Sequence, residues 1–225
     1  MTGFGPARFA LLALALVFSL GATSNWNTVV TANNGGHQIG NPAAKVKLIE
    51  FVSYTCPHCA HFATDGDGAL QLAYVGPGKV QVEVRHVIRD PIDLTVAMLT
   101  NCGPADRFRM NHATFMLKQS KWIAPLLTAS NSQRQRWYTG DNAARRRAIA
   151  SDFGLYEIMA PRGYTRPEVD RCLNDEAMAK RLAAVSAADA EKWGVKYTPS
   201  FVLNGVLLTG TATWEQLYPQ IDARL

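Results

Sequence analysis

The pattern of apolar and polar positions divides the chain into two strand-rich parts around a long helical part. A nearly continuous apolar run at residues 46–52 predicts a central strand, and alternating residues at 80–88 predict a second one. Between them lies a weak helical pattern that Gly66 and Gly68 interrupt, which predicts a broken helix. These elements form a βαβ unit whose strands should be parallel and whose crossover should be right-handed.

Helical periodicity replaces strand alternation between residues 93 and 190. Within this block, Thr165 and Glu168 give a capping-box signal, and a longer helix is predicted from Ala177 to Trp193. Strand character returns at 200–208, around an Asn-Gly pair that indicates a hairpin, and an amphipathic helix closes the chain. The predicted order is βαβ, a helical block, then ββα.

The first residues have a different character from the rest. Arg8 precedes an apolar run from Phe9 to Leu20 and then small residues, which is typical of a secretory signal peptide, predicted here at residues 1–23. The run is shorter than the roughly 20 residues of a membrane-spanning helix, although a retained anchor is the alternative. Residues 24–41 are polar and aperiodic, so we expect an exposed arm there. Export would place the protein in the oxidising periplasm.

The charges and histidines exclude some classes of function. The formal net charge is +5, and the basic residues are scattered apart from Arg145 to Arg147, which we expect to form a solvated helix face. Without a basic stripe, nucleic-acid binding is not predicted. His37, His86 and His112 are expected to be surface or core residues rather than metal ligands.

Two cysteines follow the first strand at the start of a predicted helix, in the sequence Cys56-Pro57-His58-Cys59. Free N–H groups at a helix N-terminus stabilise a thiolate. We therefore expect Cys56 to be an exposed nucleophile and Cys59 to be its buried partner. Pro57 would fix the first helical turn, and His58 would donate a hydrogen bond or positive charge to the Cys56 sulfur.

Half of a zinc site or an inert bridge are the alternatives for this pair. A structural zinc needs four ligands in paired spacings, which Cys102 and Cys172 do not supply. We therefore predict no metal and no bound cofactor. Disulfides are expected in an exported protein with an even number of cysteines, so Cys102 and Cys172 are predicted to form a structural disulfide. The alternative is two separate buried thiols.

Two further features bear on the reactive pair. Glu50 interrupts an apolar strand, where burial would raise its pKa and make it a proton carrier for Cys59; an outward position at a sheet edge is the alternative. Thr198-Pro199 opens a strand, a natural position for a cis peptide bond, although a trans turn is far commoner.

On these motifs the chain resembles the DsbA-type members of the thioredoxin superfamily. The resemblance implies an α/β thioredoxin fold at residues 42–92 and 191–225, interrupted by a helical insertion domain at 93–190. It implies that Cys56 is the nucleophile, Cys59 the resolving cysteine and Glu50 the buried acid. It also implies that Thr198-Pro199 is a cis-proline loop, which would offer backbone groups to an extended substrate.

The expected function is oxidation of cysteine-containing exported proteins while they fold. The resemblance implies a membrane partner of the DsbB type, linked to quinone, that reoxidises the enzyme. A disulfide isomerase or reductase is the nearest alternative, since family isomerases carry Thr at the position of Thr198, where oxidases more often carry Val. Family isomerases place a dimerisation domain before the thioredoxin unit. The roughly twenty residues available for it here are fewer than an ordinary domain needs, so we expect a monomer. A non-catalytic exported peptide-binding module is the other alternative.

Overall fold

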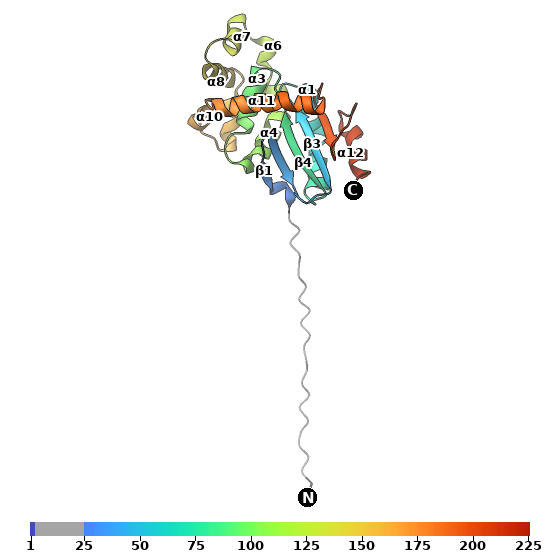
Figure 1. Ribbon diagram of the computed structural model, residues 1–225. Helices are drawn as coiled ribbons and strands as arrows, with labels where there is room; N and C mark the ends of the chain where they lie inside the picture. Colours follow the sequence, from blue (N-terminus) through green and yellow to red (C-terminus); the bar gives the residue numbers. More distant parts are fainter. Residues whose placement is uncertain (3–24) are drawn as a thin grey trace.

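A six-stranded sheet is the centre of the computed structural model, which describes residues 1–2 and 25–225 (Figure 1). Its strand order is β1-β2-β4-β3-β5-β6, with β3 and β4 parallel and every other pair antiparallel. The strands are β1 (Val30–Ala32), β2 (Gly36–Gly40), β3 (Val46–Val52), β4 (Val80–His86), β5 (Ser200–Leu203) and β6 (Val206–Leu207). The central strand and the parallel pair predicted from the apolar pattern are therefore confirmed. The predicted signal peptide lies outside the described residues, apart from its first two.

The exposed arm predicted at residues 24–41 is wrong. β1 and β2 extend the sheet beyond β4, and His37 and Ile39 of β2 are buried. The glycines that hide the strand pattern are what permit the pairing, because a Cβ at Gly36 would lie 2.3 Å from the Val84 carbonyl oxygen. The folded region therefore begins before residue 42.

The helix between β3 and β4 is broken, as predicted. α1 (Pro57–Asp65) ends at Gly66, α2 (Asp67–Leu70) follows, and a π-helical segment (Gln71–Val75) completes the connection. Gly66 lies against Trp214, the first residue of the closing helix α12 (Trp214–Asp222), where a Cβ would meet the tryptophan at 3.0 Å. The absence of a side chain at Gly66 therefore lets the start of α12 approach the end of α1 closely.

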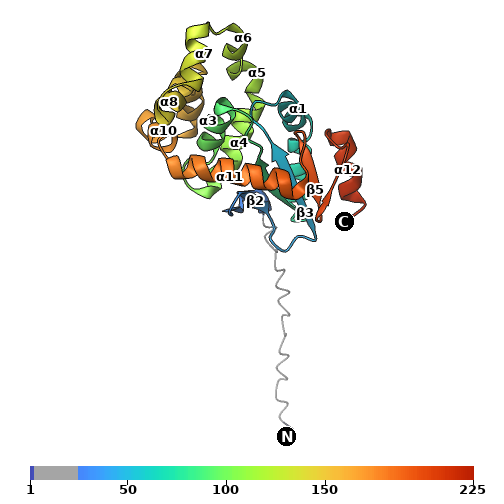
Figure 2. The ribbon, with the colours of Figure 1, turned by 45° about the horizontal axis from the view of Figure 1, so that its top comes forward.

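The helical block lies mostly beyond one end of the sheet (Figure 1). Its last helix, α11 (Glu176–Trp193), runs across the sheet and ends at left-handed Gly194 (Figure 2). Arg85 of β4 forms an ion pair of 2.8 Å with Asp189 of this helix. The other helices are α3 (Pro91–Thr100), a 3₁₀ turn (Ala105–Arg107), α4 (Phe108–Leu117), α5 (Gln119–Trp122), α6 (Pro125–Thr128), α7 (Asn131–Tyr138), α8 (Asn142–Asp152), α9 (Leu155–Met159), a second 3₁₀ turn (Ala160–Arg162) and α10 (Arg166–Leu173). Within residues 25–225, none of the helices is both long and apolar enough to cross a bilayer.

The solvated face predicted for Arg145 to Arg147 is wrong at its middle residue. Arg146 is buried, donates from Nε to the Leu173 carbonyl and pairs with Glu176. α8 packs where α10 ends, and the last carbonyls of a helix need donors from outside it. Arg146 therefore satisfies a helix end that a sequence pattern does not reveal.

Candidate active site

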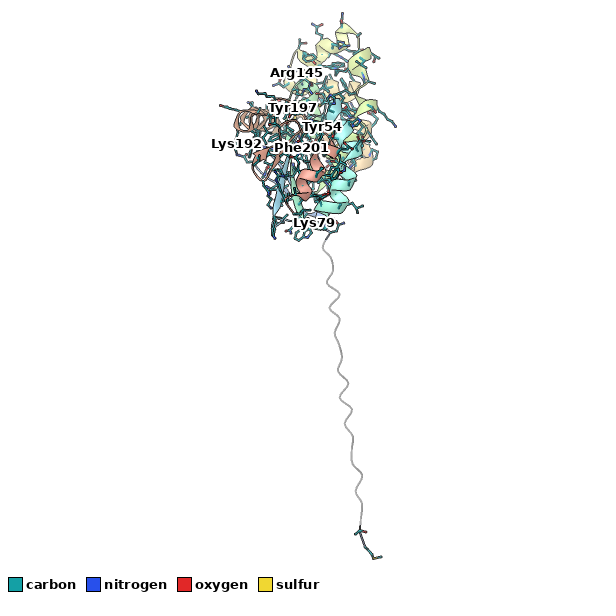
Figure 3. All side chains as sticks on the ribbon, turned by 90° about the vertical axis from the view of Figure 1, so that its right-hand side faces the viewer. Tyr54, Lys79, Arg145, Lys192, Tyr197 and Phe201 are labelled. Carbon is teal, nitrogen blue, oxygen red and sulfur yellow. A yellow bond between two sulfur atoms is a disulfide. The ribbon has the colours of Figure 1, made fainter. Side chains whose placement is uncertain are left out.

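Two loops far apart in the sequence meet around the Cys56 sulfur. The first follows β3 and ends at Cys56, the N-cap of α1, with Pro57 as the first helical residue. The second precedes β5, which pairs antiparallel with β3, so both loops lie at the same end of the sheet. Figure 3 labels one residue of each loop, Tyr54 of the first and Tyr197 of the second. The peptide bond between Thr198 and Pro199 is cis, as the resemblance implies.

Several hydrogen-bond donors surround the Cys56 sulfur and lower the pKa of this thiol from 9.0 to about 5. The largest contribution comes from the Cys59 thiol, which donates to the Cys56 thiolate, while burial acts in the opposite direction. The Thr198 hydroxyl and the main-chain N–H groups of His58 and Cys59 add further stabilisation. The Thr198 carbonyl, 3.2 Å from the sulfur, can accept only from the neutral thiol.

The pKa values of the two cysteine thiols are shifted in opposite directions, although both residues are buried. Cys59 is 1 % exposed, and burial raises its pKa well above the usual range. Its predicted burial is confirmed. The predicted exposure of Cys56 is wrong, since this residue is only 3 % exposed. Sequence spacing placed Cys56 at an open helix start, but the loop at Thr198 lies over it.

Glu50 lies in the interior of the sheet and lines a cavity of about 370 Å³. Asp67, Arg109 and His112 line the same cavity. Burial and the negative charge of Asp67 raise the pKa of the Glu50 carboxyl well above its usual range. The predicted interior position is confirmed, and the alternative at a sheet edge is wrong.

This fold and site have counterparts among known proteins. A thioredoxin family model matches residues 32–223. The chain belongs to the thioredoxin family. The predicted thioredoxin fold with a helical insertion is thereby confirmed.

Curated relatives of this thioredoxin-family chain carry the provisional name protein-disulfide oxidoreductase. The one from Rickettsia typhi is 29% identical over 175 residues, which cover 77% of this chain and 56% of the relative. The one from Rickettsia conorii is 28% identical over 188 residues, 83% of this chain and 59% of the relative. The chain thus spans somewhat more than half the length of these relatives.

Solved structures also resemble this thioredoxin-family chain. A protein-disulfide isomerase from Novosphingobium aromaticivorans is 53% identical, with a TM-score of 0.82 over 84% of this chain and 97% of that one. α-DsbA1 of Wolbachia pipientis shares the fold at 19% identity, with a TM-score of 0.68 over 84% of this chain and 90% of that one.

His58 acts on the site through its backbone rather than its ring. Its main-chain N–H contributes to the low pKa of Cys56, whereas the residue itself is exposed at the start of α1. The sequence pattern suggested donation by the imidazole. The helix-start geometry of the thioredoxin fold instead supplies the donor from the peptide.

Three polar residues that the sequence pattern did not indicate hold the loop before Cys56. Asp90 accepts from Thr55, Asp93 accepts from the Tyr54 N–H, and Gln119 donates to backbone carbonyls of the loop. Asp90-Pro91 is a recognisable helix start, but this signal does not say which loop the acids contact. Gln119 lies in an ordinary helical pattern that carries no signal for its role.

The three histidines of the helical block and sheet are core residues. His37 stacks on Phe108 at 3.8 Å between ring centroids, and Phe108 also stacks on His112. Burial lowers the pKa values of His37, His86 and His112 to about 4, 3 and 4, so they are neutral at pH 7. Over the described residues, no group of three or more His, Cys, Asp or Glu side chains could hold a metal ion.

The second cysteine pair is bridged. Cys102 and Cys172 form a disulfide with a Cα–Cα distance of 5.7 Å. Cys102 follows the end of α3 and Cys172 lies in the last turn of α10. The predicted structural disulfide is confirmed, and it joins two helices of the insertion.

Proposed function

We propose that this chain is an exported thiol:disulfide oxidase that donates the Cys56-Cys59 disulfide to cysteine-containing proteins as they fold. The observation that carries the proposal is that the pKa of the Cys56 thiol is lowered while the pKa of the Cys59 thiol is raised. One thiol is ionised at neutral pH and the other stays protonated. Such a pair has one sulfur for exchange with a substrate and one that resolves the mixed disulfide.

The stabilised thiolate supports exchange in the oxidising direction. Lowering the pKa of Cys56 from 9.0 to about 5 favours the reduced form at pH 7 by about a hundredfold. For a two-electron couple this factor corresponds to about 60 mV of added oxidising power. The disulfide form is therefore poised to accept electrons from substrate thiols.

In the proposed reaction, a substrate thiolate attacks the Cys56 sulfur of the disulfide. The bond to Cys59 breaks, and Cys59 leaves with the electron pair and takes up a proton. A second substrate thiolate then attacks the substrate sulfur of the mixed disulfide, which forms the substrate disulfide and releases Cys56 as a thiolate. Two electrons pass from substrate to enzyme.

In this proposal Glu50, which is buried in β3 six positions before Cys56, supplies the proton that Cys59 takes up. Burial raises the pKa of the Glu50 carboxyl and so favours its protonated form. Cys59 needs this proton because burial makes its thiolate costly. Glu50 takes the proton back when the disulfide is restored.

Disulfide isomerisation or reduction is the second candidate, and two observations favour it. Thr198 occupies the position before the cis-proline, and its carbonyl contacts the thiol of the reduced protein. In addition, a structure 53% identical to this chain is described as a protein-disulfide isomerase.

The reduction potential of the Cys56-Cys59 pair separates these functions. It is measured by equilibration with glutathione buffers, followed by alkylation and mass spectrometry. An oxidase should have a potential near the roughly −120 mV of DsbA, and an isomerase one near −180 mV. A potential near the roughly −270 mV of thioredoxin would overturn the oxidase proposal in favour of a reductase.

The proposed setting is the periplasm, reached by cleavage of the apolar N-terminal segment. Each turnover leaves the enzyme as a dithiol, so an electron acceptor must restore the disulfide. A quinone-linked membrane protein of the DsbB type is the proposed acceptor. Fractionation of cells that produce the tagged chain, with and without such a partner, tests both points: loss of the partner should leave Cys56 and Cys59 reduced in the periplasmic fraction.

A further inference from the structure

Helices of the insertion hold the residue that precedes the active-site turn. The Tyr54 N–H donates to Asp93 Oδ1 at 2.8 Å, and its carbonyl accepts from Gln119 Nε2 at 2.7 Å. The Tyr54 hydroxyl donates to Thr100 Oγ1 at 3.1 Å. α3 and α5 thus bind both the backbone and the side chain of Tyr54.

Gln119 also reaches the nucleophile itself. Its Nε2 donates a second hydrogen bond, of 2.8 Å, to the Cys56 carbonyl. Within α1 that carbonyl accepts only a long bond of 3.4 Å, from the Ala60 N–H. Gln119 is buried, so losing its amide would leave two backbone carbonyls in a site that water reaches poorly.

Asp93 holds the same loop from its other side. This buried carboxyl accepts from the Ser53 hydroxyl at 2.6 Å and from the Arg89 N–H at 3.1 Å. The Ser53 carbonyl in turn accepts from the Cys56 N–H at 3.2 Å. Asp93 and Gln119 therefore fix both ends of the turn that leads into α1.

We propose that Gln119, assisted by Asp93, is a positioning residue through which the helical insertion holds Cys56 where its thiolate is stabilised. The donors to the thiolate include the Cys59 thiol and backbone N–H groups of the first turn of α1, and hydrogen bonds weaken quickly as geometry departs from the optimum. A turn released by Gln119 moves the sulfur relative to these donors. The consequence for oxidising power rests on the proposed function, whereas the acidity of Cys56 does not.

The test substitutes Gln119→Leu, which removes both donors at similar volume. The pKa of Cys56 is measured in the full reduced chain by thiolate absorbance and by the pH dependence of alkylation. We expect the midpoint of the Cys56 titration to rise by about half to one pH unit, which corresponds to a threefold to tenfold loss of thiolate stability. The equilibrium constant with glutathione should shift by the same factor towards the disulfide form.

Asn111→Leu is the matched control. Asn111 is as buried as Gln119, but its side-chain hydrogen bonds within the described residues go to Tyr164, at 3.0 Å, and Arg162 rather than to the loop. This variant should lower the melting temperature and leave the Cys56 midpoint unchanged. If Gln119→Leu also leaves the midpoint within about 0.2 pH units of the parent, the positioning role is wrong.

Asp93→Asn provides a second route if Gln119→Leu does not fold. The amide keeps an oxygen for the Tyr54 N–H but replaces the acceptor for Ser53 with a donor. We expect a smaller upward shift of the Cys56 midpoint, and no shift in this variant would contradict the proposal. Because thiol acidity is measured without a protein substrate, the result stands even if the chain proves not to be an oxidase.

Discussion

The two cysteine pairs of this chain differ in reactivity, although Cys56, Cys59 and Cys102 are all buried and Cys172 is partly buried. Cys56 and Cys59 have two residues between them at the start of α1 and are free thiols. Cys102 and Cys172 are 70 positions apart and are bridged. Cys56 faces hydrogen-bond donors at a helix start. Cys102 and Cys172 lie at helix ends, where carbonyl oxygens disfavour a thiolate. Placement relative to helix ends, rather than exposure, therefore separates the reactive pair from the structural one.

The largest expected effect is the loss of exchange when Cys56 becomes Ser. Without this sulfur no mixed disulfide can form, so the oxidation rate of a reduced model protein should fall by roughly a thousandfold or more. The double substitution Cys102→Ser and Cys172→Ser should retain exchange within a few fold. A Cys56→Ser protein that still restores disulfide formation in cells lacking their oxidase would favour the non-catalytic binding module.

Removing the second disulfide should instead reduce stability. The bridge closes a 70-residue separation, for which loop-closure entropy gives about 4 kcal/mol. Urea unfolding of the Cys102→Ser, Cys172→Ser protein should show this loss in the free energy of unfolding. A loss below about 1 kcal/mol would mean that packing of α3 against α10 holds the insertion without the bridge.

The third prediction concerns pH. Folding lowers the pKa of Cys56 from 9.0 to about 5, so its stabilisation of the reduced protein is complete above pH 9 and disappears as the pH falls to 5. At pH 7 it should amount to about 2.7 kcal/mol. The measurement is the unfolding free energy of the reduced protein minus that of Cys56→Ser across this range. A difference that does not change with pH would contradict the assigned acidity.

Glu50→Gln should slow the step in which Cys59 leaves. The amide keeps the shape of the side chain but cannot transfer a proton, so we expect the exchange rate at pH 7 to fall by about tenfold to a hundredfold. Asp65→Asn, which changes an exposed carboxyl on α1, should have no effect. If Glu50→Gln exchanges at the parent rate at every pH, water alone supplies the proton.

The smallest expected effect is that of Thr198→Val. Loss of the hydroxyl removes one of several donors to the Cys56 thiolate, so the pKa of Cys56 should rise by about half a unit and oxidising power should fall about threefold. Thr64→Val on the exposed side of α1 is the control. A fall in the pKa of Cys56 would show that the Thr198 carbonyl, rather than its hydroxyl, governs the thiolate.

Local patterns were sufficient for most of the secondary structure. The continuous apolar run of β3, the hairpin at Asn204-Gly205 and the capping box at Thr165 are confirmed, because each depends on residues adjacent in sequence. The arm at 24–41 was wrong for the opposite reason. β2 is stabilised by pairing with β4, a distant partner, and its glycines carry no alternation.

By itself, the sequence determined the βαβ and ββα order, the reactive pair at a helix start, and the interior position of Glu50. These three features follow from the spacing and apolar character of residues that lie close together in the sequence. Only the tertiary structure decided that Cys56 is covered by the loop at Thr198 and that Gln119 holds its carbonyl. Both contacts join segments more than sixty residues apart, and a hydrogen bond across such a separation depends on the packing of whole elements rather than on local sequence.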